Sequence, residues 1–117
     1  MYEYRATITR VVDGDTVDVT LDLGFDILYN SRIRLYGINA PESRTRDLEE
    51  KERGLAAKER VKELCPVGAS ITLKTIKDGK GKYGRILGEI YIEGILQSIN
   101  QLLVEEGHAV EYLGGSR

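Results

Sequence analysis

Residues 16–23 alternate strictly between apolar and polar side chains, and this pattern constrains the fold more than any other part of the chain. The apolar members are Val17, Val19, Leu21 and Leu23, and the polar members are Thr16, Asp18, Thr20 and Asp22. A period of two predicts a β-strand with one face in a core and the other in solvent. Asp13-Gly14 directly before it is a hairpin-turn signal, so residues 6–12 are the predicted partner strand. The chain must therefore fold around a sheet.

The remaining predicted elements complete a five-stranded pattern. We predict a third strand at about 31–38, ended by Pro41, and a charged loop over residues 42–53 with room for a helical turn. A helix follows, ended by Pro66 and Gly68, because one apolar stripe has helical spacing: Ala57, Val61, Leu64 and Cys65. Strands are predicted at 70–76 and 85–92, and Ser98 opens a capping box for a second short helix, after which residues 109–112 are extended.

The order of these elements indicates the fold class. Three strands, a helix, two strands and a helix are the order of a mainly β chain with some α, a five-stranded Greek-key OB-fold barrel with two or three short helices. At 117 residues, the length predicts a single domain over residues 1–117.

Composition and charge narrow the class of protein. No apolar run approaches the ~20 residues of a membrane helix, and no secretory signal is visible at the N-terminus. The single cysteine, Cys65, fits a reducing cytoplasm. The net charge is only −2, but bases gather in residues 31–46 and 66–88. If these two segments converge, they form a surface facing a polyanion; the alternative is a chance mixture on a solvated surface.

Five segments of the chain resemble the staphylococcal (micrococcal) nuclease family, in family order and over roughly residues 5–112. They are VVDGDTVDV, RIRLYGINAPE, GLAAKERVKEL, GKYGRILGEIYI and NQLLVEEGHAVEY. The resemblance implies an OB-fold nuclease that uses Ca²⁺. Its substrate would be DNA, with RNA as a further substrate, cut with little sequence preference to leave 3′-phosphate ends. The implied protein has no membrane partner, with a monomer favoured, and we expect a cytoplasmic protein encoded by a phage or mobile element.

The resemblance implies a metal site at Asp15, Asn39 and Ala40. Asp15 matches the first metal carboxylate of the family, and Ala40 stands where a backbone carbonyl is a ligand. Asn39 stands where the family usually has its second metal aspartate. Asparagine keeps an oxygen donor but removes one negative charge, so we expect weaker Ca²⁺ binding unless Asp13 or Asp18 compensates.

The resemblance also implies the groups that act on the phosphodiester. Glu42 matches the proposed general base, and Arg34 and Arg85 match the two arginines that hold the scissile phosphate. Guanidiniums suit this task because they bind phosphate oxygens in a bidentate manner. Substrate contacts are implied for three further residues, Lys82, Tyr83 and Tyr112.

Two other functions stay open at this stage. Asp13-Gly14-Asp15 is also an ordinary hairpin turn, and Asn39 is compatible with a catalytically weak or inactive OB-fold module that binds nucleic acid or a protein partner. A structural subunit that assembles through an exposed hairpin is a weaker alternative.

Overall fold

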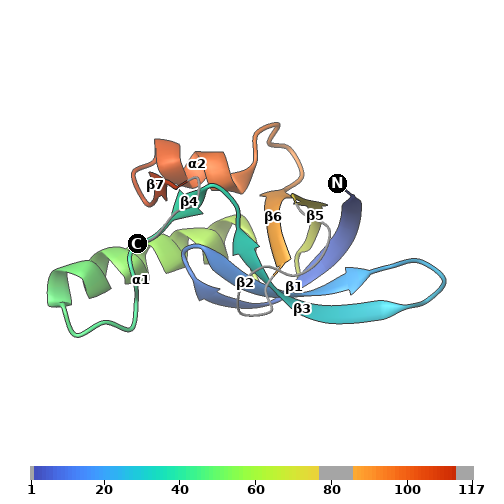
Figure 1. Ribbon diagram of the computed structural model, residues 1–117, viewed down its shortest axis with the longest axis horizontal. Helices are drawn as coiled ribbons and strands as arrows, with labels where there is room; N and C mark the ends of the chain where they lie inside the picture. The colour runs from blue at the N-terminus through green and yellow to red at the C-terminus, as the bar shows by residue number, and fades with distance from the viewer. Residues whose placement is uncertain (1, 77–85, 113–117) are drawn as a thin grey trace.

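Five strands close into a barrel in the order β1-β2-β3-β6-β5 (Figure 1). The computed structural model describes residues 2–76 and 86–112. The barrel strands are β1 (Glu3–Asp13), β2 (Thr16–Asp22), β3 (Leu28–Leu35), β5 (Ser70–Thr75) and β6 (Ile86–Tyr91). Neighbouring strands are antiparallel except β3 and β6, which are parallel. This closed barrel confirms the predicted mainly β class and is consistent with an OB-fold.

Two helices and a small second sheet complete the described part of the chain. The helices are α1 (Leu48–Leu64) and α2 (Ile99–Glu105), and β4 (Ile38–Asn39) pairs with β7 (Val110–Glu111). In Figure 1, α2 lies beside this small sheet, and α1 runs along one end of the barrel. Within the described ranges, neither helix is long and apolar enough to cross a membrane.

Residues 48–53 of the predicted loop 42–53 are helical and form the start of α1, so the helical turn allowed for in this segment continues without a break into the predicted helix. Asp47 is the N-cap of α1, and its Oδ1 accepts hydrogen bonds from the N–H groups of Glu49 at 3.0 Å and Glu50 at 3.2 Å. Two glutamates in the first turn add a favourable interaction with the helix dipole. The cap and the dipole start the helix well before its apolar stripe.

The predicted single strand 31–38 is divided into β3 and β4. Gly37 has a φ of 82°, in the left-handed region that glycine adopts without a steric penalty, and the chain bends there. At its other end β3 begins earlier than predicted, because it forms a long hairpin with β2 that projects beyond the barrel (Figure 1). The bend at Gly37 turns Asn39 toward the turn between β1 and β2.

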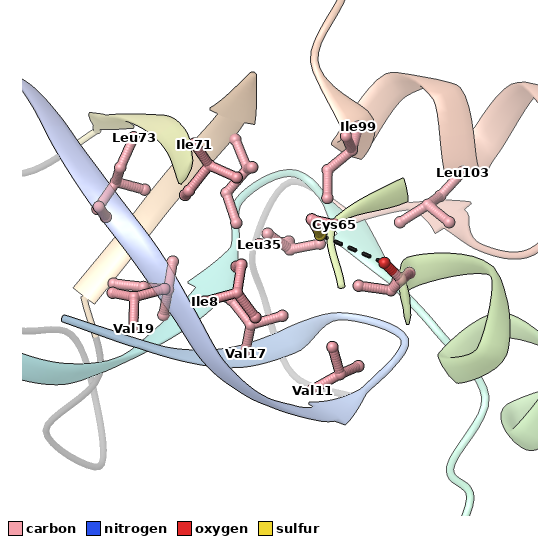
Figure 2. Close-up of a cluster of buried hydrophobic side chains, with 14 of the residues drawn as sticks. Ile8, Val11, Val17, Val19, Leu35, Cys65, Ile71, Leu73, Ile99 and Leu103 are labelled. Carbon is pink, nitrogen blue, oxygen red and sulfur yellow. Dashed lines mark hydrogen bonds between the residues drawn. The ribbon is translucent and has the colours of Figure 1, made fainter. Parts of the chain in front are cut away.

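Aliphatic side chains from every barrel strand and from both helices fill the core (Figure 2). The alternation that opened the sequence analysis is confirmed along β2, where Val17, Val19 and Leu21 are at most 2% exposed. Leu23 lies past the end of β2 and is 40% exposed, because the hairpin has left the barrel there. The helix α1 contributes Ala57 and Val61 to the same core, and its C-cap residue Cys65 adds a third side chain.

We expect the Cys65 thiol to be unreactive in the folded protein. It is fully buried, its Sγ donates a hydrogen bond to the carbonyl of Val61 at 3.3 Å, and burial raises its pKa to about 11. Because the thiolate is the reactive form, a thiol reagent such as DTNB should label Cys65 slowly in buffer and at once in denaturant. Glutathione serves as the reference for an exposed thiol. Native labelling at the glutathione rate would contradict this account.

Candidate active site

The turn between β1 and β2 packs tightly against the end of β4 and against α1. A Cβ atom on Gly14 would lie 2.9 Å from the Cβ of Ala40 and 2.7 Å from the Cβ of Ala57. Only glycine leaves room for this approach. Gly14 therefore allows the turn to pack in the junction between the end of β4 and α1. The packing brings Asp15 to Ala40, which is far from it in sequence.

Asp15 is largely buried in this junction, with 8% of the residue exposed. Its Oδ2 accepts the N–H of Ala40 at 2.9 Å, and its Oδ1 accepts the hydroxyl of Thr16 at 3.0 Å. Nη2 of Arg34 lies 3.6 Å from the same Oδ2. The β2–β3 register sets this ion pair, because Thr16 is the cross-strand partner of Arg34.

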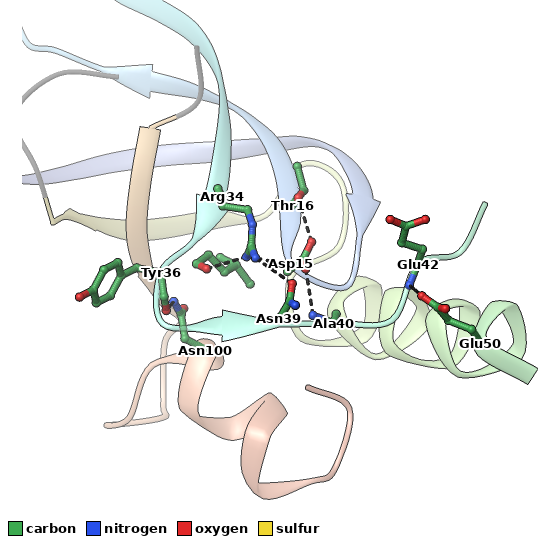
Figure 3. A network of polar contacts seen from close by, with 10 residues as sticks. Asp15, Thr16, Arg34, Tyr36, Asn39, Ala40, Glu42, Glu50 and Asn100 are labelled. Carbon is green, nitrogen blue, oxygen red and sulfur yellow. Dashed lines mark hydrogen bonds and ion pairs between the residues drawn. The ribbon is translucent and has the colours of Figure 1, made fainter. Parts of the chain in front are cut away.

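The guanidinium of Arg34 is held between the strand and Asn39 (Figure 3). Its Nη1 donates to the carbonyl of Leu35 at 2.9 Å, and its Nη2 donates to Oδ1 of Asn39 at 3.1 Å. The Arg34 side chain is 13% exposed. Asn39 therefore contacts the positive group through the same oxygen that was predicted to contact a metal.

The oxygen atoms around Asp15 fit a hard cation such as Ca²⁺. The carboxylate of Asp15 and the amide oxygen of Asn39 both lie near Nη2 of Arg34, and Ca²⁺ takes carboxylate and amide oxygens together with backbone carbonyls and water. In the described part of the chain, Oδ1 of Asp13 is buried and has no hydrogen-bond partner. A buried carboxylate oxygen without a partner is costly, and a nearby cation would satisfy it.

These candidate oxygen ligands carry little negative charge. Among the described residues, no group of three or more His, Cys, Asp or Glu side chains is placed to hold a metal. Asp18, one of the two acids predicted as a compensating charge, makes a bidentate ion pair with Arg32 at 2.8 and 3.2 Å. Any cation at Asp15 would thus depend on the Asp15 carboxylate and on neutral oxygen atoms.

Glu42 lies apart from the Asp15–Arg34 group. It is exposed, and Figure 3 shows its carboxylate pointing away from Asp15. Its backbone N–H donates to Oε2 of Glu50 at 3.1 Å, while its carboxylate accepts no hydrogen bond from the described residues. Catalytic contacts are often absent without substrate and form in the complex, so this geometry leaves Glu42 a candidate base.

Tyr112 lies beside β4. Its N–H donates to the carbonyl of Gly37 at 2.8 Å, which extends the pairing of β7 with β4. Lys82, Tyr83 and Arg85, the other predicted substrate and catalytic residues, lie outside the described residues.

Asn100 holds the end of the strand that carries Arg34, although from the sequence it is only an inner residue of the capping box that begins at Ser98. It is 3% exposed, and its Nδ2 donates to the carbonyls of Tyr36 at 2.9 Å and Gly88 at 3.1 Å. Its Oδ1 accepts the N–H of Ile90 at 3.2 Å. Asn100 thus joins α2 to β6 and to Tyr36, the residue that directly follows β3. Arg34 lies on β3, two residues before Tyr36.

Comparison with known proteins finds similarity to one sequence family and to several proteins named as nucleases. Residues 32–116 match the sequence family described as staphylococcal nuclease homologue. The chain is 33% identical to endonuclease YhcR of Bacillus subtilis (strain 168), over 94% of this chain and 9% of that protein. It is 35% identical to the SPbeta prophage-derived endonuclease YokF of the same strain, over 88% of this chain and 32% of that protein. It is 30% identical to the micrococcal nuclease of Shigella flexneri, over 94% of this chain and 59% of that protein. The chain spans less than two thirds of the length of each of these relatives.

Proposed function

This chain belongs to the family of staphylococcal nuclease homologues, and on that premise we propose that it is a Ca²⁺-dependent nuclease. Its proposed reaction is hydrolysis of phosphodiester bonds in DNA, and also in RNA, with little sequence preference. The observation that carries the proposal is the group of Asp15, Arg34 and Asn39, in which oxygen ligands for a hard cation adjoin a phosphate-binding guanidinium. Three relatives named as nucleases support the same reaction class.

The proposed mechanism assigns one role to each part of the site. Asp15, Asn39 and the carbonyl of Ala40 would hold Ca²⁺, with Asp13 close in sequence. A cation held there would supply Lewis-acid chemistry at the phosphoryl group. The guanidinium of Arg34 binds a non-bridging phosphate oxygen and stabilises the charge that develops there during attack.

The remaining roles concern proton transfer and substrate contact. Glu42 accepts a proton from the attacking water, directly or through a second water, as the new bond to phosphorus forms. The bond to the 5′-oxygen then breaks, the oxygen leaves with the bonding electron pair and takes a proton from solvent water to become a 5′-hydroxyl, and the other product ends in a 3′-phosphate. Arg85 is proposed as the second phosphate-binding guanidinium. Contacts to the nucleotide and to a terminal phosphate are assigned to three residues, Lys82, Tyr83 and Tyr112.

A cleavage assay with and without metal tests this function. End-labelled single-stranded DNA is incubated with the protein in Ca²⁺ and, in parallel, in excess EGTA. We expect cleavage in Ca²⁺, loss of cleavage in EGTA, and products that gain a free 3′-hydroxyl only after phosphatase treatment. DNA that is retained in a gel-shift assay but never cut would contradict the proposal and support a binding module.

The binding module is the second candidate because of Asn39. An asparagine in the metal corner removes a charge, and in this structure its oxygen accepts a hydrogen bond from Arg34. A module of this kind would bind nucleic acid with the same guanidinium and without metal. The two candidates therefore differ in whether Ca²⁺ binds at all.

We expect Asn39→Asp to tighten Ca²⁺ binding by about tenfold or more, equal to ~1.4 kcal/mol. The reason is electrostatic, since a second carboxylate joins Asp15 in a corner that is only partly exposed. Isothermal titration with Ca²⁺ measures the change. Asn30→Asp is the matched control, because it adds the same charge to the exposed part of β3. Unchanged or weaker binding in Asn39→Asp would show that residue 39 is not a metal ligand.

A further inference from the structure

Gly54 lies where the backbone of Glu42 crosses α1. A Cβ atom on Gly54 would overlap the carbonyl oxygen of Glu42, and it would lie 2.5 Å from the carbonyl carbon of Glu42 and 2.7 Å from the amide nitrogen of Ser43. These contacts are with backbone atoms, which cannot move aside as a flexible side chain does. The helix and the Glu42–Ser43 peptide are therefore in direct contact, and only glycine permits it.

No other feature of α1 explains a glycine at position 54. Gly54 lies inside α1, where glycine is less favourable than alanine by roughly 1 kcal/mol. Its φ is not in the positive range that favours glycine. The close approach of Glu42 is thus the physical reason for a residue that weakens the helix.

Glu50 holds the preceding peptide unit, on the other side of the Glu42 Cα atom. It lies one helical turn before Gly54, and its Oε2 accepts the N–H of Glu42 at 3.1 Å (Figure 3). Ser43, the next residue, is 5% exposed. The Glu42 side chain is in solvent, but its backbone is fixed to α1 on both sides, by the hydrogen bond at Glu50 and by the contact at Gly54.

The same helix also fixes the turn that carries Asp15. Ala57 lies three residues after Gly54, so the two residues are neighbours on one face of α1. The Cβ of Ala57 is the atom that a side chain on Gly14 would strike, at 2.7 Å. One face of α1 therefore contacts both the backbone of Glu42 and the turn next to Asp15.

We propose that Glu50 and Gly54 are positioning residues that place Glu42 relative to the Asp15–Arg34 group. The inference rests on the proposed function, in which Glu42 is the general base. A base must lie within hydrogen-bond reach of the attacking water, and a displacement of about 1 Å can reduce the rate by roughly 100-fold. The helix face supplies that placement, because it holds the two parts of the site at a fixed separation.

The test compares Gly54→Ala, Glu50→Ala and Glu50→Gln in the cleavage assay. We expect Gly54→Ala to lower kcat by roughly 100-fold, with KM for DNA and the Kd for Ca²⁺ within about twofold of the parent. Glu50→Ala should lower kcat by about tenfold, and Glu50→Gln should restore most of it, because the amide oxygen still accepts the N–H of Glu42. Glu59→Ala, on an exposed position of α1, controls for general effects on the helix. The Glu50 pair keeps the test valid if Gly54→Ala does not fold.

A double-mutant cycle separates positioning from a general loss of structure. If Gly54 acts through Glu42, then Gly54→Ala should have no further effect in a Glu42→Gln background. Multiplying losses, or full activity of both Gly54→Ala and Glu50→Ala, would overturn the inference while leaving the nuclease function in place. Full activity of Glu42→Gln by itself would instead refute the role of Glu42 in the proposed function.

Discussion

Replacing Glu42 with glutamine is expected to lower kcat for DNA cleavage by roughly 10²- to 10⁴-fold, the range for loss of a general base. Glutamine has nearly the same size and keeps the backbone N–H that donates to Glu50. It lacks a basic oxygen that can take the proton of the attacking water. Because Glu42 is exposed and contacts none of Asp15, Arg34 and Asn39 through its carboxylate, Ca²⁺ binding and folding should be unchanged.

Single-turnover cleavage at saturating protein measures this loss without a contribution from product release. Glu49→Gln is the matched control, since Glu49 is an exposed glutamate in the first turn of α1, beside Glu50. Its rate should equal that of the parent. If Glu42→Gln cleaved DNA at the parent rate, the base would have to be another group, and the proposed mechanism would need revision at that step.

Replacing Asn100 with leucine is expected to lower the free energy of unfolding by about 2–5 kcal/mol. Leucine has the same branching and the same number of side-chain heavy atoms as asparagine, so the loss comes from hydrogen bonds and not from a cavity. Two backbone groups would lose their partner, namely the carbonyl of Tyr36 and the N–H of Ile90, while the carbonyl of Gly88 would keep only the N–H of Tyr36. A buried polar group left unsatisfied costs about 1–3 kcal/mol.

Urea denaturation measures this change as a shift in the midpoint at constant m-value. Gln101→Leu is the control, because Gln101 is the exposed neighbour of Asn100 on α2. Its effect should stay within about 0.5 kcal/mol. A change of that small size in Asn100→Leu would mean that the carbonyl of Tyr36 and the N–H of Ile90 find other partners.

The Asn100 hydrogen bonds also concern the site. The barrel closes between β3 and β6 through parallel pairs that include Arg34 with Leu87 and Leu35 with Gly88. Asn100 holds Tyr36 and Gly88 at the end of this short ladder. Its loss would therefore loosen the strand that positions the Arg34 guanidinium.

Much of the fold was predictable because it depends on neighbours in the chain. The period of two along residues 16–23 places Val17, Val19 and Leu21 on one face of a strand, and that face is buried in the barrel. The stripe of α1 at Ala57 and Val61 follows in the same way from the helical period. The start of α1 was missed because the Asp47 cap lies within a charged segment that has no apolar period.

The same distinction between local pattern and tertiary packing applies to the site. By itself, the sequence determined the candidates, since Asp15, Arg34, Asn39 and Glu42 stand in motifs that resemble a nuclease family. Only the tertiary structure decided their contacts. The amide oxygen of Asn39 meets the guanidinium of Arg34, and the backbone of Glu42 lies on Gly54.

Asn100 shows the limit of sequence reasoning most clearly, because its partner Tyr36 is 64 residues away. Local patterns report which face of an element is apolar, since that depends on residues two to four positions apart. Which polar groups meet depends on how the barrel closes and where α1 and α2 pack against it. That packing is set by the whole core, so no single segment of the sequence contains it.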